Sequence, residues 1–228
     1  LNGTSPADRQ IKRAQELMDE GRGDEARKLM LEALSAARLE KNEEQEAEAL
    51  IALVLASSPR RGIGDRERHF RELEKKEGHL KTPALRALFH RARAAFRLDE
   101  GDQEGAARAF EEALDACASA PDDEKQNHGI QACVTRADYI HLLCSLKRLK
   151  EAQAMLISCE EYARENTGLE GGALLQVALE AGIHLSLECG DQQGAIDRIS
   201  ELEASATSAR LADRVGGDLL NVANQSSH

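Results

Sequence analysis

The chain has 228 residues, of which 41% are hydrophobic, 31% charged and 3% aromatic, with a formal net charge of −11. This balance excludes an intrinsically disordered chain, and the abundance of alanine and leucine without strand-like alternation predicts an all-α protein. No apolar run approaches the roughly 18 residues of a membrane span, so no membrane partner is expected.

Capping residues predict the first two helical hairpins. Ser5-Pro6 has the residue types of a helix N-cap and first helical position, and a glycine-rich break at 21–23 separates two helices. A turn this short predicts an antiparallel hairpin over 6–40. The next two helices form a hairpin over 43–77. Its second helix lacks the small–large–small apolar pattern of the other hairpins, so altered packing is expected there.

Thr82-Pro83 caps the next hairpin as Ser5-Pro6 caps the first. A capping box at Thr167–Glu170 begins the last one. The absence of a polar linker predicts one domain over 1–228, and a chain that begins with Leu1 is expected to be a fragment of a longer protein. The remaining predicted hairpins and a short C-terminal capping helix span 82–118, 123–165, 169–206 and 208–222.

An apolar pattern with spacings of four and three recurs in the second helices of four hairpins, and we call it the second-helix stripe. In two hairpins it follows the same turn, Gly101-Asp102 in one and Gly190-Asp191 in the other. The average repeat is about 42 residues, and self-similarity at such a period indicates a helical repeat protein. The stripes are Ala26, Met30, Ala33; Ala106, Phe110, Ala113; Ala152, Leu156, Cys159; and Ala195, Ile199, Leu202.

The turn and stripe from Gly101 to Ala113 resemble the second half of a tetratricopeptide (TPR) repeat, and Gly23-Asp24 before Ala26 is a less complete match. The resemblance implies a right-handed α-solenoid of about five antiparallel hairpins, whose first helices line an inner groove. The period is longer than the usual one of about 34 residues. Longer variants occur in transcriptional regulators, motor light chains and signalling scaffolds. Proteins of this family are adaptors and sensors far more often than enzymes.

The sequence contains no strong catalytic, nucleotide or metal-binding motif, so we expect no enzyme activity, no cofactor and no metal site. The five cysteines include no Cys-x-x-Cys pair, and their number is odd. They are predicted to be buried, reduced thiols of a cytoplasmic protein.

One polar constellation forms the candidate binding site. Four residues of the fifth helix are spaced four, three and four apart, which places them on one face. Aligning Ala137 with Ala92 extends the stripe to the seventh helix, and counterpart positions also occur in the ninth helix. The predicted groove is basic in its middle and apolar towards its C-terminal end. The candidates are Arg86, His90, Arg93, Arg97, Thr135, Asp138, Leu175 and Leu179.

Two interpretations of this basic stripe remain open. It could bind a protein or peptide segment with acidic and hydrophobic residues. Alternatively, it could pair with acids on neighbouring helices, such as Asp138 or Glu46, as ordinary surface. The leading function is a protein–protein interaction module, and the alternative is a ligand- or peptide-sensing regulatory domain of a larger signalling or transcription protein. Nucleic-acid binding through the basic region 60–97 is disfavoured by the net charge and the scarcity of aromatics.

Overall fold

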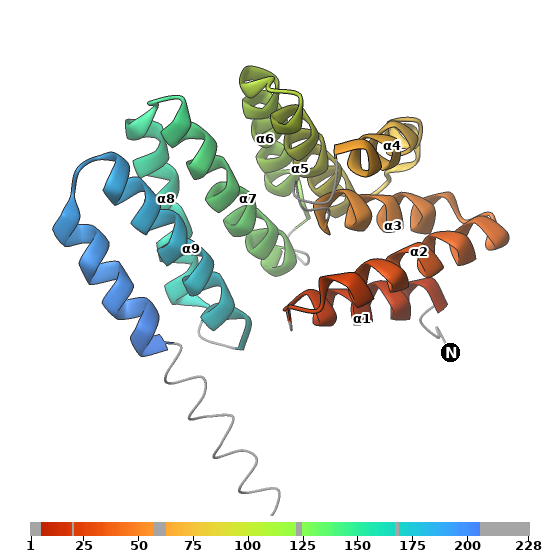
Figure 1. The fold of residues 1–228 in the computed structure, drawn as a ribbon, viewed down its shortest axis with the longest axis horizontal. Coiled ribbons are helices and arrows are strands. Elements are labelled where there is room, and N and C mark those ends of the chain that lie inside the picture. The colour runs from red at the N-terminus through yellow and green to blue at the C-terminus, as the bar shows by residue number, and fades with distance from the viewer. Residues whose placement is uncertain (1–5, 20, 57–62, 122–124, 167–168, 206–228) are drawn as a thin grey trace, which may run out of the picture. The chain divides into compact units, whose positions relative to one another are not determined.

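The structure, a computed structural model, is all-α in the residues that it describes, which are 6–19, 21–56, 63–121, 125–166 and 169–205 (Figure 1). The predicted capping helix 208–222 lies outside them. No helix in this part of the chain combines the length and apolar character that a membrane crossing requires. The elements are α1 (Pro6–Asp19), α2 (Gly23–Glu40), α3 (Glu43–Ala56), α4 (Ile63–Glu74), η2 (Glu77–His79), α5 (Pro83–Asp99), α6 (Gln103–Ala118), α7 (Lys125–Ser145), α8 (Leu149–Glu165), α9 (Leu169–Glu188) and a helix over 192–205.

Of the predicted caps Ser5, Thr82 and Thr167, only Thr82 lies in the described residues. Thr82 caps α5 as predicted, since its Oγ1 accepts a hydrogen bond of 3.2 Å from the Leu85 amide. The boundaries of α4 differ from the helix that the sequence predicts from Asp65 to about Glu77, since α4 begins at Ile63 and ends at Glu74, two and about three residues earlier. The expected start at Asp65 gave Gly64 too much weight as a helix breaker, because a glycine in the first turn interrupts little of the helix.

The chain divides into two compact units, Leu1–Gln131 (unit 1) and Ala132–His228 (unit 2), with the division inside α7. In unit 1, α1 packs on α2, α3 on α4 and α5 on α6. The first helices of these hairpins also contact one another, α1 with α3 and α3 with α5. Such contacts between neighbouring hairpins are the ones that a stack of helical repeats needs. The single domain over 1–228 stays a prediction.

The second hairpin packs differently from the others, as its sequence predicts. Its helix α4 buries Arg66, Phe70 and Leu73, which have the four–three spacing of the second-helix stripe. Phe70 stacks on Phe96 with ring centroids 4.5 Å apart. Arg66 therefore takes the position that alanine holds in the other hairpins. An ion pair of 2.7 Å with Asp99 accommodates the buried guanidinium.

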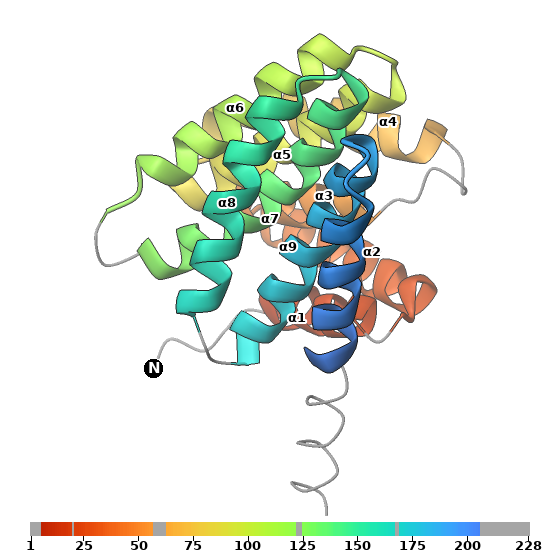
Figure 2. The same cartoon turned by 90° about the vertical axis from the view of Figure 1, so that its left-hand side faces the viewer.

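In unit 2, α8 packs on α9, and α9 packs on the helix 192–205 (Figures 1 and 2). Gly182 provides room for the second of these contacts, since a Cβ there would lie 2.5 Å from Nε of Arg198. The stripe of the last helix is less covered than its counterparts. Ile199 is 42% exposed, whereas Met30, Phe110 and Leu156 are at most 2% exposed.

The turn inside a hairpin has a common backbone register. Residues with positive φ stand five positions before the first alanine of each stripe, at Gly21 (75°), Gly101 (77°), Lys147 (60°) and Gly190 (73°). This register corrects the sequence alignment of the first hairpin. Gly21, rather than Gly23, is the counterpart of Gly101, because only Gly21 adopts the left-handed conformation that the turn requires.

Two side-chain arrangements complete this turn. In one, Asp102 and Asp191 are N-caps whose Oδ1 accepts the amide of the residue three positions on, at 2.8 Å from Gly105 and 3.0 Å from Gly194. A Cβ on Gly105 would lie 2.0 Å from Asp102 Oδ2, so the cap requires glycine.

In the other arrangement, arginine replaces the aspartate and glutamate replaces the glycine. Arg22 makes two hydrogen bonds to Glu25, of 2.8 and 2.6 Å. Arg148 makes two to Glu151, of 2.7 and 2.6 Å. The position three residues after the cap thus carries either no side chain or a carboxylate, according to the residue at the cap.

Candidate functional site

The candidate site in unit 1 is built on α5, next to its buried aromatic face. Phe89 and Phe96 lie in the core, and the Arg93 guanidinium lies over the Phe89 ring, 4.5 Å from its centroid. This cation–π contact fixes the stem of Arg93 while its nitrogens reach polar partners. Two residues of the stripe, Arg93 and Arg97, line one surface hollow.

This hollow has a volume of about 290 Å³, and we call it the α5–α6 hollow. Besides the two α5 arginines, its residues come from the second helices α4 and α6 and from the turn before α6. The sequence analysis expected the stripe to face a groove lined by first helices, whereas these two arginines lie beside second helices. The lining residues are Glu74, Arg93, Arg97, Asp102, Gly105, Arg108, Ala109 and Glu112.

The two α5 arginines of the hollow, Arg93 and Arg97, each pair with acidic residues, not all of which line the hollow. Arg93 donates to Glu77 Oε2 at 2.9 Å, and its Nη1 lies 3.3 Å from Glu112 Oε2. Glu112 Oε2 also lies 2.9 Å from Nδ1 of His90. Arg97 pairs with Glu100 at 3.0 Å. Because Glu77 and Glu112 are each 51% exposed, water screens these pairs, and a competing carboxylate can replace them at small cost.

Burial holds the pKa of His90 below its ordinary value, and the neighbouring Arg93 acts in the same direction, while Glu112 opposes both. His90 is therefore uncharged at neutral pH. The positive charge of the site then comes from its arginines, which stay protonated at every physiological pH.

Arg108 of α6 was missed by sequence reasoning. It is exposed, lines the hollow, and forms no ion pair among the described residues. The second helices were interpreted only through their apolar residues, which were assigned to packing, so the charged residues of α6 were not considered. The spacing of four between Arg108 and Glu112 is the signal that identifies a charged face on α6.

The fourth member of the α5 stripe lies apart from the hollow. Arg86 donates to the backbone carbonyl of Lys81 at 3.1 Å. The alternative interpretation, in which the stripe pairs with acids on neighbouring helices, holds for Arg93. Its partners, however, are Glu77 and Glu112, which that interpretation did not name. Glu46, which it did name, bonds instead to Arg38 and Lys76, at 3.0 and 2.8 Å.

The four candidates of unit 2 differ in exposure. Thr135 and Leu179 are 1% and 0% exposed, so these two residues are corrected to packing positions, because a buried side chain cannot contact a partner at the surface. Asp138 on α7 and Leu175 on α9 are half-buried and stay candidates. Helical spacing alone placed Thr135 and Leu179 on the candidate stripe, and it did not show that neighbouring helices cover both side chains.

The cysteines and the residue types that bind metals were also compared with the sequence predictions. All five cysteines lie in the described residues and none forms a disulfide; four are buried as predicted, whereas Cys189 is exposed, so the prediction of burial is wrong for that residue. No cluster of three or more histidine, cysteine or acidic side chains suited to a metal ion occurs in the described segments.

Comparison with known proteins gives one informative likeness. The chain resembles the crystal structure of a putative kinesin light chain from Podospora anserina, described as having nearly identical TPR-like repeats. The TM-score is 0.54 at 13% identity, and the match covers 91% of this chain and 99% of the other. No family model matches the sequence, and no curated protein matches it. The fold is therefore a TPR-like α-solenoid.

Proposed function

We propose that this chain is a protein–protein interaction module that binds a partner segment carrying acidic and hydrophobic residues. The observation that carries the proposal is the α5–α6 hollow, where three guanidinium groups, Arg93, Arg97 and Arg108, line one depression. Guanidinium forks suit carboxylates because two parallel N–H donors match two carboxylate oxygens.

Arg108 is the proposed first contact for a partner carboxylate, because it forms no ion pair among the described residues. Arg93 then exchanges its exposed partner Glu112 for a second carboxylate of the partner. Exchange of this kind favours binding modestly, since the broken pair is itself weak in water. Binding by this route is electrostatic in part, so it weakens as salt concentration rises.

The experiment is selection of peptides from a displayed random library on the purified full chain. Selected sequences are expected to be rich in Asp and Glu interspersed with apolar residues. For synthetic copies of them, Arg108→Glu is expected to weaken binding about tenfold, equivalent to about 1.4 kcal/mol. Copies with Gln and Asn in place of the acids are expected to lose the same amount.

Arg13→Glu on α1 is the matched control, since it makes the same charge reversal on an exposed arginine outside the hollow. Its peptide affinity is expected to stay within about twofold of that of the wild type, because the changed net charge has only a small nonspecific effect. Equal losses in the two variants, or selected peptides without acidic residues, would exclude the hollow as the binding site.

A further inference from the structure

Two buried thiols of unit 2 lie unusually close together. Cys133 on α7 and Cys159 on α8 are both fully buried, with their Sγ atoms 2.8 Å apart. Each sulfur also lies against the other residue's backbone, at 3.3 Å from Cys159 Sγ to the Cys133 carbonyl oxygen and 3.7 Å for the reverse contact. A disulfide has its sulfurs about 2.05 Å apart, so a small side-chain movement separates this pair from a covalent bond.

The repeat architecture does not require this pair. Cys159 is the third residue of its second-helix stripe, and the corresponding residues are Ala33, Ala113 and Leu202. Packing at that position is therefore satisfied by side chains without a thiol. Neither cysteine belongs to the α5–α6 hollow, so the pair has chemistry that the proposed function does not use.

We propose that Cys133 and Cys159 form a reversible redox site, at which hydrogen peroxide joins α7 to α8 through a disulfide. The Cys133 thiolate attacks one peroxide oxygen, the O–O bond breaks, and the products are a sulfenic acid and, after protonation, water. The Cys159 sulfur then attacks the sulfenic sulfur, the S–S bond forms, and a second water leaves with the thiol proton. The two sulfurs lose two electrons in all, and the peroxide gains them. A dithiol reductant reverses the reaction.

The surroundings of the two sulfurs assign these roles. The hydrogen bond with Cys159 holds the pKa of Cys133 below its ordinary value, whereas the hydrogen bond with Cys133 and burial hold the pKa of Cys159 above its own. Cys133 is therefore the attacking group and Cys159 the resolving group. Complete burial makes the reaction depend on local opening, so oxidation is expected to be slower than that of an exposed thiol.

Cys144 and Cys189 make up the competing pair in unit 2. Cys189 is exposed, but burial, followed by the charge of Glu188, raises the pKa of Cys144 to about 11. Cys144 is thus a poor nucleophile at neutral pH. A disulfide between these two cysteines would be a different site from the one proposed.

Tryptic mapping distinguishes the two pairs, because Lys and Arg positions put each cysteine in a separate peptide. The reduced full chain is treated with hydrogen peroxide, alkylated and digested without reductant. We expect peptide 126–136 joined to peptide 151–164, with the loss of two hydrogens and of two of the five titratable thiols. Thermal unfolding is expected at a higher temperature after oxidation and at the original temperature after dithiothreitol.

Cys159→Ala is the test variant, since alanine occupies the same position in two other hairpins, and Cys133→Ala is the second. Both are expected to lose the cross-link and the rise in unfolding temperature. Cys117→Ala in unit 1 is the matched control and is expected to keep both. The proposal is overturned if all five thiols remain titratable in the wild type, or if the cross-link joins Cys144 to Cys189 or two separate chains.

Discussion

Arg66 is the residue at which this chain departs most from its own repeat. Its side chain and that of its partner Asp99 are 9% and 11% exposed, and its Nε finds no hydrogen-bond partner among the described residues. Asp99 ends α5, where the helix dipole disfavours a negative charge. The pair therefore stabilises the fold mainly by each charge compensating the other.

Arg66→Ala is expected to lower the free energy of unfolding by about 3 kcal/mol, because it leaves the Asp99 carboxylate buried without a partner. The double replacement Arg66→Met with Asp99→Leu is expected to recover most of that loss, since a well-packed apolar pair can replace a buried ion pair. Urea unfolding of the variants measures both values. A double variant as unstable as the single one would show that the charges themselves are required.

At the scale of elements, the caps and turns explain why the helices begin where they do. Thr82 was identified as a cap from its residue type and the proline that follows it, whereas Asp102 was assigned only to the turn before α6. The Arg22–Glu25 and Arg148–Glu151 turns were not identified, because arginine is not a preferred capping residue and its role depends on a glutamate partner.

The effect of Gly105→Ala on stability is predicted to change sign when the Asp102 cap of α6 is removed. Asp102→Ala is expected to lower stability by about 1 kcal/mol through loss of the cap. Gly105→Ala alone is also expected to destabilise, because its Cβ would displace the Asp102 carboxylate. Combined with Asp102→Ala, however, Gly105→Ala is expected to stabilise, since alanine is preferred to glycine in a helix by up to about 1 kcal/mol. Thermal unfolding of the four proteins checks this, and an equal effect of Gly105→Ala in both backgrounds contradicts it.

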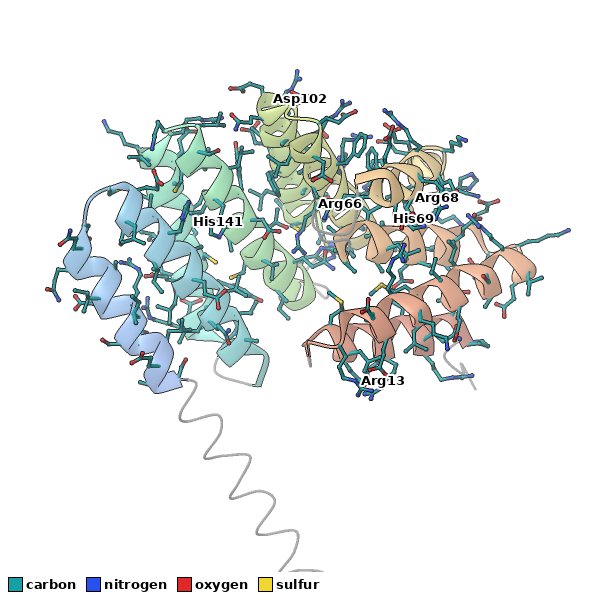
Figure 3. The ribbon with its side chains drawn as sticks, in the orientation of Figure 1. Arg13, Arg66, Arg68, His69, Asp102 and His141 are labelled. Atoms are coloured by element: carbon teal, nitrogen blue, oxygen red, sulfur yellow. The ribbon has the colours of Figure 1, made fainter. Side chains whose placement is uncertain are left out.

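At the scale of the whole molecule, histidines in both units make stability depend on pH. Burial is the largest cause that lowers the pKa values of His69 on α4, His90 on α5 and His141 on α7. For His141, which is labelled in Figure 3, the ring of His184 acts in the same direction, with the two ring centroids 4.8 Å apart. Each imidazole binds protons more weakly in the folded protein than in the unfolded chain.

The histidine contribution to the free energy of unfolding is therefore expected to be fully present above the ordinary histidine pKa of about 6.5. It is expected to fall as the pH drops below that value, because the unfolded chain then binds more protons than the folded protein. The urea midpoint should be lower at about pH 5.5 than at about pH 7.5, and His141→Gln should reduce the difference. Carboxylates such as Glu188, whose pKa is lowered by a hydrogen bond from Lys147, affect stability only at lower pH. A midpoint that is unchanged or higher at pH 5.5 would refute the prediction.

The repeat architecture could be predicted from the sequence, because apolar spacing and capping are local properties of the chain. The candidate site could be predicted only in part. The α5 stripe follows from helical spacing, but its partners Glu77 and Glu112 come from other elements, and packing decides which side chains meet. Thr135 and Leu179 were misassigned for the same reason, since spacing alone does not tell which face of a helix is covered.

The two turn arrangements have a consequence for how the repeats are compared. Aspartate occurs with glycine three positions on, and arginine occurs with glutamate, so the allowed residue at one position depends on the residue at the other. A comparison that scores every position separately counts Asp102 against Arg148, and Gly105 against Glu151, as two independent mismatches. When the two positions are scored as a pair, they are two side-chain arrangements of the same turn. The internal symmetry of this chain is therefore greater than its residue identities suggest.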